Sequence, residues 1–233
     1  MKLLLTSSGI NNPSIYDALV DLLGKPIAES SALIVPTGIY PFPNGSHMAW
    51  RAISGTAPSP FAELGWKSLG VLELTALTSI QEESWVPSLR ETDALYVWGG
   101  SVLYLRYWME QSGLAELLPS LPDLVYVGCS AGSIVTTPYN CDAESNLRFV
   151  PSGSDMALDA ERALGLVDFP LCVHLVEEGS PGNSLAEIEA WAAGVTVPTY
   201  AIDDETAIKV TNDSVEVVSE GRWKLLNPAT TVD

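Results

Sequence analysis

The chain has 233 residues, 47% of them hydrophobic and 17% charged, and this length is ample for a substantial apolar core. It carries 29 Asp and Glu residues against 11 Lys and Arg residues, and the formal charge of −18 repels phosphate backbones, which argues against nucleic acid as a partner. The normal apolar fraction also excludes a disordered acidic chain.

Short apolar runs bounded by Gly, Pro or Ser recur along the chain, as in buried parallel sheets. These predicted strands lie at residues 2–6, 32–36, 70–74, 94–98, 124–128, 171–175 and 200–210. Helical stretches are predicted between several of them, at residues 13–23, 104–118 and 185–193. The alternation of strands and helices predicts an α/β fold with a mainly parallel sheet flanked by helices.

The C-terminal part shows a different pattern. Residues 207–210, 214–219 and 222–226 have the pattern of strands joined by tight turns, which predicts a β-meander that closes one edge of the sheet. Residues 36–60 are rich in Pro, Gly and Ser, and we expect a long surface loop there. The chain has no internal repeat and no low-complexity linker, so residues 1–233 are expected to form a single domain.

Neither a metal site nor a targeting segment is indicated. The three cysteines, Cys129, Cys141 and Cys172, are an odd number without the close pairing of a zinc site. The N-terminal apolar run is too short for a signal peptide, and no run approaches the roughly 20 residues of a membrane span. We therefore expect a cytoplasmic protein with reduced thiols, no metal and no membrane partner.

The clearest chemical motif is Gly-x-Ser-x-Gly at residues 128–132, directly after the predicted strand at 124–128 and before a second apolar run. This context is that of a nucleophile elbow, in which small neighbours let the chain turn tightly around an exposed serine. The helix that follows would aim its N-terminal amides at an oxyanion. Ser130 is the candidate nucleophile; the alternative is a tight turn with a buried serine.

A serine nucleophile needs a base, and the chain contains only two histidines. His174 lies at the end of an apolar strand, where the active crevice of a parallel sheet is found. His47 lies in the Pro/Gly-rich stretch at 36–60. We favour His174 as the base, with a buried structural histidine as the alternative.

A third residue, a carboxylate, should hold the imidazole in one tautomer. In so acidic a chain most carboxylates coat the surface, and the residues alone leave several candidates. They are Asp142 and Glu144 after the elbow, and Asp203, Asp204 and Glu205 after the run at 199–202.

A second pair of glycines, Gly99 and Gly100, follows the predicted strand at 94–98. Such a pair lets a backbone N–H approach a ligand closely, which could provide an oxyanion donor, although an ordinary strand-to-helix turn explains it equally well. The spacing is not that of a dinucleotide fingerprint and no phosphate-loop lysine follows, so no nucleotide cofactor is expected.

Three segments resemble the peptidase E (dipeptidase E) family of serine peptidases, within the class I glutamine amidotransferase-like superfamily. They are residues 98–105, 126–132 and 164–169, the last running on to His174. The resemblance implies a doubly wound sheet, Ser130 as nucleophile, His174 as base, and an oxyanion hole formed by Gly99, Gly100 and the Ala131 amide. It also favours an acid soon after the elbow, with Asp142 first and Glu144 next, ahead of Asp203 and Asp204.

The chain departs from the family at two points. Val173 precedes the histidine, where the family commonly has proline. Aspartyl dipeptidases hold the substrate's aspartate with an arginine after the histidine, and here no arginine lies between His174 and Gly221. Glu187 and Glu189 stand in that stretch instead, so we expect Asp-X dipeptides to be poor substrates, and peptides with a neutral or basic first residue to be cleaved better.

The sequence therefore predicts a serine hydrolase of small peptides, without a cofactor, acting as a monomer or homodimer. One alternative is a catalytically silent small-molecule-binding protein on the same scaffold. The other is an esterase of the α/β-hydrolase type, but such enzymes place their histidine close to the C-terminus, whereas 59 residues follow His174 here. Cys129 is disfavoured as a nucleophile because it lies one residue before the apex of the elbow.

Overall fold

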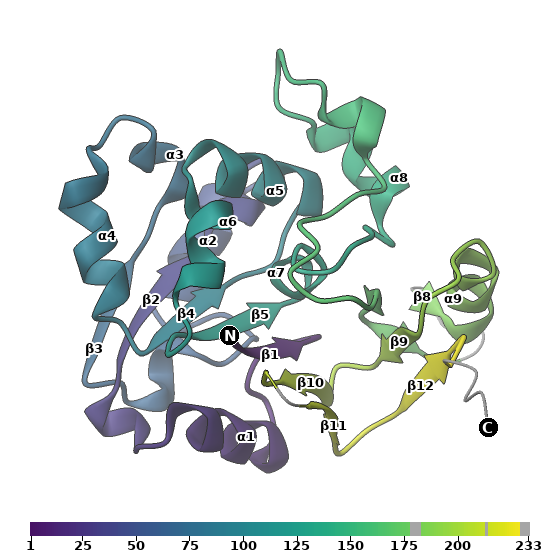
Figure 1. Cartoon of the computed structure of the whole chain (residues 1–233), viewed down its shortest axis with the longest axis horizontal. Coiled ribbons are helices and arrows are strands. Elements are labelled where there is room, and N and C mark those ends of the chain that lie inside the picture. The colour runs from purple at the N-terminus through teal and green to yellow at the C-terminus, as the bar shows by residue number, and fades with distance from the viewer. Residues whose placement is uncertain (178–182, 213, 229–233) are drawn as a thin grey trace.

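The computed structural model describes residues 1–177, 183–212 and 214–228, and in this part of the chain a seven-stranded sheet forms the centre (Figure 1). The strand order is β11-β10-β1-β5-β4-β2-β3. The strands are β1 (Lys2–Thr6), β2 (Ser31–Val35), β3 (Ser68–Val71), β4 (Ala94–Val97), β5 (Val125–Cys129), β10 (Thr206–Val210) and β11 (Val215–Ser219). Neighbouring strands are parallel from β1 through β5, β4 and β2 to β3. β10 is antiparallel to β1, and β11 is antiparallel to β10. The predicted mainly parallel α/β sheet is therefore confirmed.

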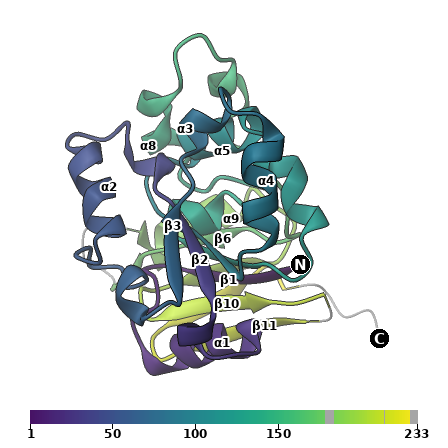
Figure 2. The same cartoon turned by 90° about the vertical axis from the view of Figure 1, so that its left-hand side faces the viewer.

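Helices cover both faces of this sheet. They are α1 (Pro13–Leu23), α2 (Gly45–Ile53), α3 (Leu74–Leu77), α4 (Glu82–Arg90), α5 (Val102–Gln111), α6 (Leu114–Leu117), α7 (Ala131–Ile134), α8 (Ala143–Asn146) and α9 (Leu185–Ala192). Apolar residues of α1 and α2 pack in one buried cluster, and those of α3 to α7 pack in another. Figure 2 shows α2 and α4 on opposite sides of β2 and β3.

The strands of the central sheet are apolar because helices cover both of its faces. Successive side chains of a strand point to opposite faces, and in β1 Leu3 and Leu5 enter one cluster while Leu4 enters the other. A strand buried on both faces must be apolar throughout, which is why the short apolar runs of the sequence mark the strands.

Two smaller sheets lie beside the C-terminal ends of β1 and β5 (Figure 1). One has the order β12-β9-β6, and the other pairs β7 with β8. Their strands are β6 (Leu171–Cys172), β7 (Leu175–Val176), β8 (Asn183–Ser184), β9 (Thr199–Ile202) and β12 (Trp223–Leu226). Helix α9 packs against them through Ile188 and Ala192.

The expected strand at 200–210 is in fact two strands, β9 and β10, which belong to different sheets. The turn between them is held by Asp203, whose Oδ1 accepts hydrogen bonds from the Thr206 hydroxyl at 2.7 Å and the Glu205 amide at 3.2 Å. The expected meander is correct for β10 and β11, which close one edge of the central sheet. Its third strand, β12, instead pairs with β9.

Three further local expectations are wrong. The strand expected at 171–175 is divided into β6 and β7, which belong to different sheets. The stretch at 36–60, expected to be a loop, contains helix α2, and the helix expected at 104–118 is divided into α5 and α6. Gly113 lies between those two helices with φ 75, a left-handed conformation that ends α5 and that glycine adopts without steric strain. The single domain expected for residues 1–233 stays a prediction.

Within the described ranges, none of the helices has the length and apolar character needed to cross a bilayer.

Candidate active site

Ser130 lies at a sharp turn between β5 and α7, as the elbow pattern predicts. Its backbone has φ 52 and ψ −118, outside the common regions for a residue with a side chain. The flanking glycines make this turn possible. A Cβ on Gly132 would lie 1.8 Å from the carbonyl oxygen of Val97, and a Cβ on Gly128 would lie 2.7 Å from the carbonyl oxygen of Gly132.

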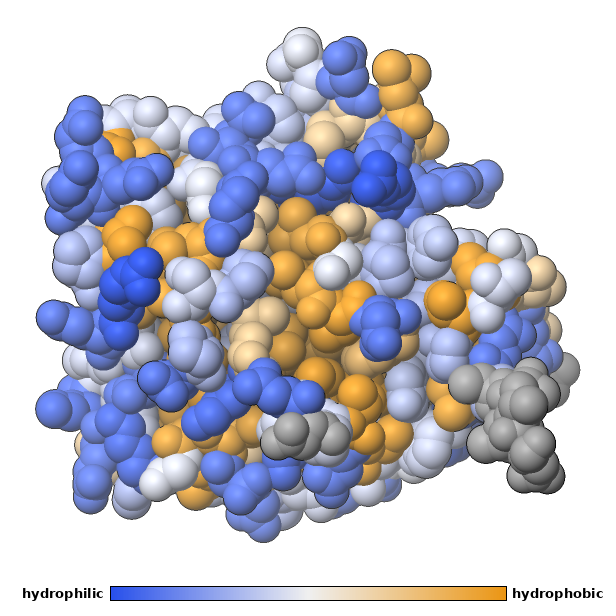
Figure 3. Space-filling model, in the orientation of Figure 1, coloured by the Kyte–Doolittle hydropathy of each residue, from blue (hydrophilic) through white to orange (hydrophobic). Residues whose placement is uncertain are grey.

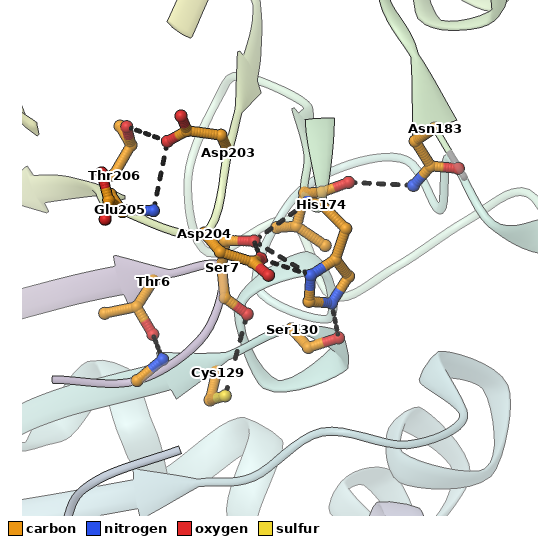
Figure 4. A network of polar contacts seen from close by, with 12 residues as sticks. Thr6, Ser7, Cys129, Ser130, His174, Asn183, Asp203, Asp204, Glu205 and Thr206 are labelled. Atoms are coloured by element: carbon orange, nitrogen blue, oxygen red, sulfur yellow. Dashed lines mark hydrogen bonds and ion pairs between the residues drawn. The ribbon is translucent and has the colours of Figure 1, made fainter. Parts of the chain in front are cut away.

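His174 lies in the connection between β6 and β7, and its imidazole reaches the serine. The Nε2 atom is 2.9 Å from the Ser130 hydroxyl oxygen (Figure 4). His174 has φ 57, and it and Ser130 are two of the four non-glycine residues with positive φ in the described part of the chain. Residues held in such regions cost about 1–3 kcal/mol each and cluster at functional sites.

Asp204, in the turn between β9 and β10, contacts the other ring nitrogen. Its Oδ1 atom is 2.6 Å from Nδ1 of His174, and the Ser7 hydroxyl donates to the same oxygen at 2.7 Å. The hydrogen bond with His174 is the main cause of a lowered pKa of Asp204; partial burial raises this pKa, and the bond from Ser7 lowers it again. Asp204 is therefore held as a carboxylate anion beside the imidazole.

Asp142, predicted to contact His174, does not do so. Its Oδ2 accepts from the Asn146 side chain at 2.6 Å and its Oδ1 accepts from the Ser145 hydroxyl, both within the turn that opens α8. Glu144 is exposed on the same helix. The carboxylate beside the imidazole is therefore that of Asp204, which the sequence analysis kept as a less favoured candidate, and not that of Asp142.

The Gly99–Gly100 turn after β4 lies against the elbow. A Cβ on Gly99 would be 3.2 Å from Cβ of Ser130 and 3.6 Å from its hydroxyl oxygen. Gly100 has φ 131, and a Cβ there would be 2.1 Å from the Gly38 carbonyl oxygen. Across the described ranges, the amides of Gly99 and Gly100 donate no hydrogen bond, and that of Ala131 opens α7, where helical N–H groups lack partners within the helix. Gly99 therefore lies against Ser130, and Ala131 is the residue that follows it.

The remaining candidates lie elsewhere. His47 is exposed on α2 rather than in a loop. The thiol of Cys129 is buried and donates to the Ser7 carbonyl at 3.8 Å, and burial raises its pKa, which disfavours the thiolate a nucleophile needs. In the described residues, no group of three or more His, Cys, Asp or Glu side chains has an arrangement suited to a metal ion.

Glu187 and Glu189, which stand in the stretch where aspartyl dipeptidases have an arginine, have partners within the chain. Glu187 forms a capping box with Ser184 at the start of α9, and Glu189 pairs with Lys224 at 2.6 Å. Arg222 lines the same cleft as Glu189 and Lys224, and its side chain is 3.7 Å from that of Glu177.

Sequence reasoning missed Ser7 altogether. Its hydroxyl contacts both His174 and Asp204, and the side chain is fully buried at the end of β1. One signal was available, because a polar residue that ends a buried parallel strand lies at the edge where active sites form.

The fold and this geometry define a class, the doubly wound α/β proteins with a serine at a strand-to-helix elbow. Residues 3–218 match the model of peptidase family S51, so the chain belongs to that family. It is a peptidase family, and the peptidase interpretation of the sequence is confirmed at this level.

Solved structures support the same fold. A Listeria monocytogenes EGD-e protein described as a peptidase E candidate superposes with a TM-score of 0.65 at 19% identity, over 94% of this chain and 98% of that one. A peptidase from an acI-B1 Actinobacterium has a TM-score of 0.60 at 17% identity, over 98% of this chain and 94% of that one. No curated protein sequence matches the chain.

Proposed function

We propose that the protein is a serine peptidase that cleaves small peptides with Ser130 as nucleophile, His174 as general base and acid, and Asp204 as the orienting carboxylate. The observation that carries the proposal is the continuous chain of contacts from the Ser130 hydroxyl through the imidazole to Asp204, with lengths of 2.9 and 2.6 Å. Membership of family S51 supports the peptide bond as the target.

In the first step the Ser130 oxygen attacks the carbonyl carbon of the scissile bond, and Nε2 of His174 takes the hydroxyl proton. For Nε2 to accept this proton, the resting imidazole must carry its own proton on Nδ1, where it donates to Asp204. Asp204 thereby selects the productive tautomer and stabilises the imidazolium that forms.

The tetrahedral intermediate then collapses. The carbon–nitrogen bond breaks, the imidazolium passes its proton to the leaving amine, and an acyl-enzyme remains on Ser130. Water then attacks the ester carbon while Nε2 of His174 takes a water proton. The bond from this carbon to the Ser130 oxygen breaks, the imidazolium returns its proton to that oxygen, and the carboxylic acid product leaves.

Negative charge develops on the carbonyl oxygen during both halves of the reaction. We assign its stabilisation to the amides of Gly99 and Gly100, in the turn that lies against Ser130, and to the amide of Ala131, the next residue along the chain. Amide donors fixed before the reaction need no reorganisation, and loss of one such donor typically slows turnover by about 10²–10³-fold.

The preference for small peptides rests on the resemblance of residues 98–105, 126–132 and 164–169 to peptidase E. We further propose that the enzyme needs no cofactor, acts as a monomer or homodimer, and works in the cytoplasm.

Labelling with a fluorophosphonate tests the proposal without knowledge of the substrate. We expect one covalent adduct, which peptide mapping locates on Ser130, and no adduct in Ser130→Ala. The same variant should lose peptide hydrolysis by about 10⁴–10⁶-fold while keeping its fold. Absence of labelling in the wild type would instead favour the silent binding protein, and more than a tenth of the activity in Ser130→Ala would exclude this serine as the nucleophile.

A further inference from the structure

Ser7 lies between the two parts of the site that come from opposite sides of β1. In the pairing of β1 with β5, Thr6 is opposite Cys129, so the next residues along, Ser7 and Ser130, leave the sheet side by side. The Ser130 amide donates to the Thr6 carbonyl at 3.1 Å. On the other side of β1, the Ser7 amide donates to the Thr206 carbonyl at 3.4 Å, just beyond the turn that carries Asp204.

The hydroxyl of Ser7 uses its donor and an acceptor position for different partners. It donates its single proton to Oδ1 of Asp204 at 2.7 Å, and it accepts from the backbone amide of His174 at 2.9 Å. Nδ1 of His174 is 3.2 Å from the same oxygen, a longer contact than its 2.6 Å contact with Asp204. The buried Ser7 hydroxyl therefore contacts the backbone of His174 and the side chain of Asp204 (Figure 4).

The Ser7 hydroxyl can hold the backbone of His174 and the side chain of Asp204 in fixed positions. His174 enters from a connection outside the central sheet and has φ 57, so its backbone stays in place only if its surroundings hold it there. Asp204 enters from a separate turn. Ser7 is fully buried directly after the end of β1, the strand between β5 and β10, and its hydroxyl contacts both residues.

We propose that Ser7 is a positioning residue of the peptidase, one that fixes the His174 backbone and the Asp204 carboxylate relative to Ser130. This inference rests on the function proposed above. Because Ser7 is buried below the triad, it does not face substrate, and its hydroxyl acts only through His174 and Asp204.

The proposal predicts a particular kinetic effect. In Ser7→Ala the imidazole loses the anchor of its own backbone amide, and Asp204 loses a hydrogen bond. A small misplacement of catalytic groups slows the chemical step by about 10–100-fold. We expect kcat and the rate of fluorophosphonate labelling to fall by about that factor, with KM changed less than twofold if substrate binding is untouched.

A matched control separates positioning from stability. Ser30 is another fully buried serine, whose hydroxyl donates to the Pro26 carbonyl at 3.0 Å at the start of β2, opposite the active edge of the sheet. Ser30→Ala removes the same group from a comparable environment, and we expect it to lower stability without changing kcat. Ser7→Cys serves as the second variant, because it keeps nearly the side-chain volume but donates poorly, and it should show the same loss of kcat.

A spectroscopic readout follows the imidazole directly. The chain has only two histidines, so in ¹⁵N-histidine-labelled protein the His47→Ala spectrum identifies the signals of His174. We expect the low-field Nδ1 proton of His174 to be present in the wild type and in Ser30→Ala, and to be broadened or lost in Ser7→Ala and Ser7→Cys.

The outcomes distinguish this inference from the proposed function. If Ser130 is labelled and essential but both Ser7 variants keep kcat within twofold of wild type, Ser7 is not a positioning residue and the peptidase proposal stands. If the wild type is not labelled and Ser130→Ala retains activity, both proposals are overturned.

Discussion

Asp204 is partly exposed, and yet its carboxylate is held by two hydrogen bonds on one oxygen, from Ser7 and from the imidazole of His174. An exposed ion pair by itself contributes little to stability, because water screens it. The value of this pair lies in orientation, since a carboxylate on Nδ1 selects the tautomer that leaves Nε2 free to accept a proton.

Replacement of this acid by its amide tests that role. We expect Asp204→Asn to lower kcat by about 10³–10⁴-fold, because the amide can stabilise the wrong tautomer and cannot balance an imidazolium. Asp142→Asn is the matched control, since the Asp142 carboxylate contacts only its own turn, and its kcat should stay within threefold of wild type. Steady-state kinetics on one peptide substrate compare the two variants. A larger loss of kcat in Asp142→Asn than in Asp204→Asn would show that Asp142 is the orienting carboxylate.

The lowered pKa of Asp204 also makes a prediction about stability. A carboxylate whose folded pKa lies below its usual value of 3.8 stabilises the fold fully above that value, and this contribution is lost as the pH falls through the folded pKa. The difference in free energy of unfolding between wild type and Asp204→Asn should thus be largest at about pH 7 and smaller at about pH 3, below the usual value. Urea unfolding at the two pH values measures it, and a difference that persists or grows in acid contradicts the assignment.

The elbow between β5 and α7 depends on close backbone approach rather than on side-chain contacts. Gly132 faces the end of β4, where a Cβ would be 1.8 Å from the Val97 carbonyl oxygen. Since that oxygen belongs to the backbone of a central strand, relief of the clash would require a displacement of β4 or α7.

We therefore expect Gly132→Ala to lower the free energy of unfolding by about 3 kcal/mol or more and to abolish activity through displacement of Ser130. Gly194→Ala is the control, because a Cβ there meets only the Trp191 carbonyl oxygen at 3.3 Å and lies far from the elbow in sequence. Chemical denaturation with activity assays measures both effects. Wild-type stability in Gly132→Ala would mean that β4 and α7 are not packed as tightly as the geometry requires.

The predictable elements are those whose signal is local. β1 lies at the expected residues 2–6, and the elbow turns at the expected serine, because a buried strand and a tight turn each leave their composition in a few neighbouring residues. The sequence does not predict the division of residues 200–210 into two strands, because both strands are apolar and they differ only in the sheet to which each belongs.

For a related reason the sequence ranks Asp204 below Asp142 and gives no role to Ser7. Asp142 is 12 residues from Ser130 and Asp204 is 74, but distance along the chain does not measure distance in space. The antiparallel pairing of β10 with β1 brings the turn at Asp204 to the end of β1, where Ser7 lies. Only the sheet order contains that information.

At the scale of the whole molecule, no Asp, Glu, Lys or Arg side chain is buried in the part of the chain that the structure describes. Figure 3 shows hydrophilic residues around the rim of one face, with apolar side chains gathered in its middle. The region beside His174 differs from this acidic background. Elements β7, α9 and β12 line a cleft of about 510 Å³, whose walls include Arg222 and Lys224.

Both cations on this wall are balanced. Lys224 is 2.6 Å from Glu189, and Arg222 is 3.7 Å from Glu177, so the four side chains together carry no net charge. A substrate carboxylate placed here would have to displace one of these acids before it gained a cationic partner of its own. An unpaired carboxylate in a cleft is disfavoured by the water that it loses.

A panel of dipeptides tests the consequence. At fixed ionic strength, we expect Ala-Leu and Lys-Leu to have higher kcat/KM values than Asp-Leu, because a neutral or basic first residue leaves the paired acids in place. Glu189→Gln frees Lys224 from its partner, and it should raise the relative kcat/KM for Asp-Leu, whereas Glu187→Gln, which changes only the cap of α9, should leave the ratio unaltered. A tenfold preference of the wild type for Asp-Leu, about 1.4 kcal/mol in transition-state binding, would show that an unbalanced cation reaches the substrate and that the paired wall does not set specificity.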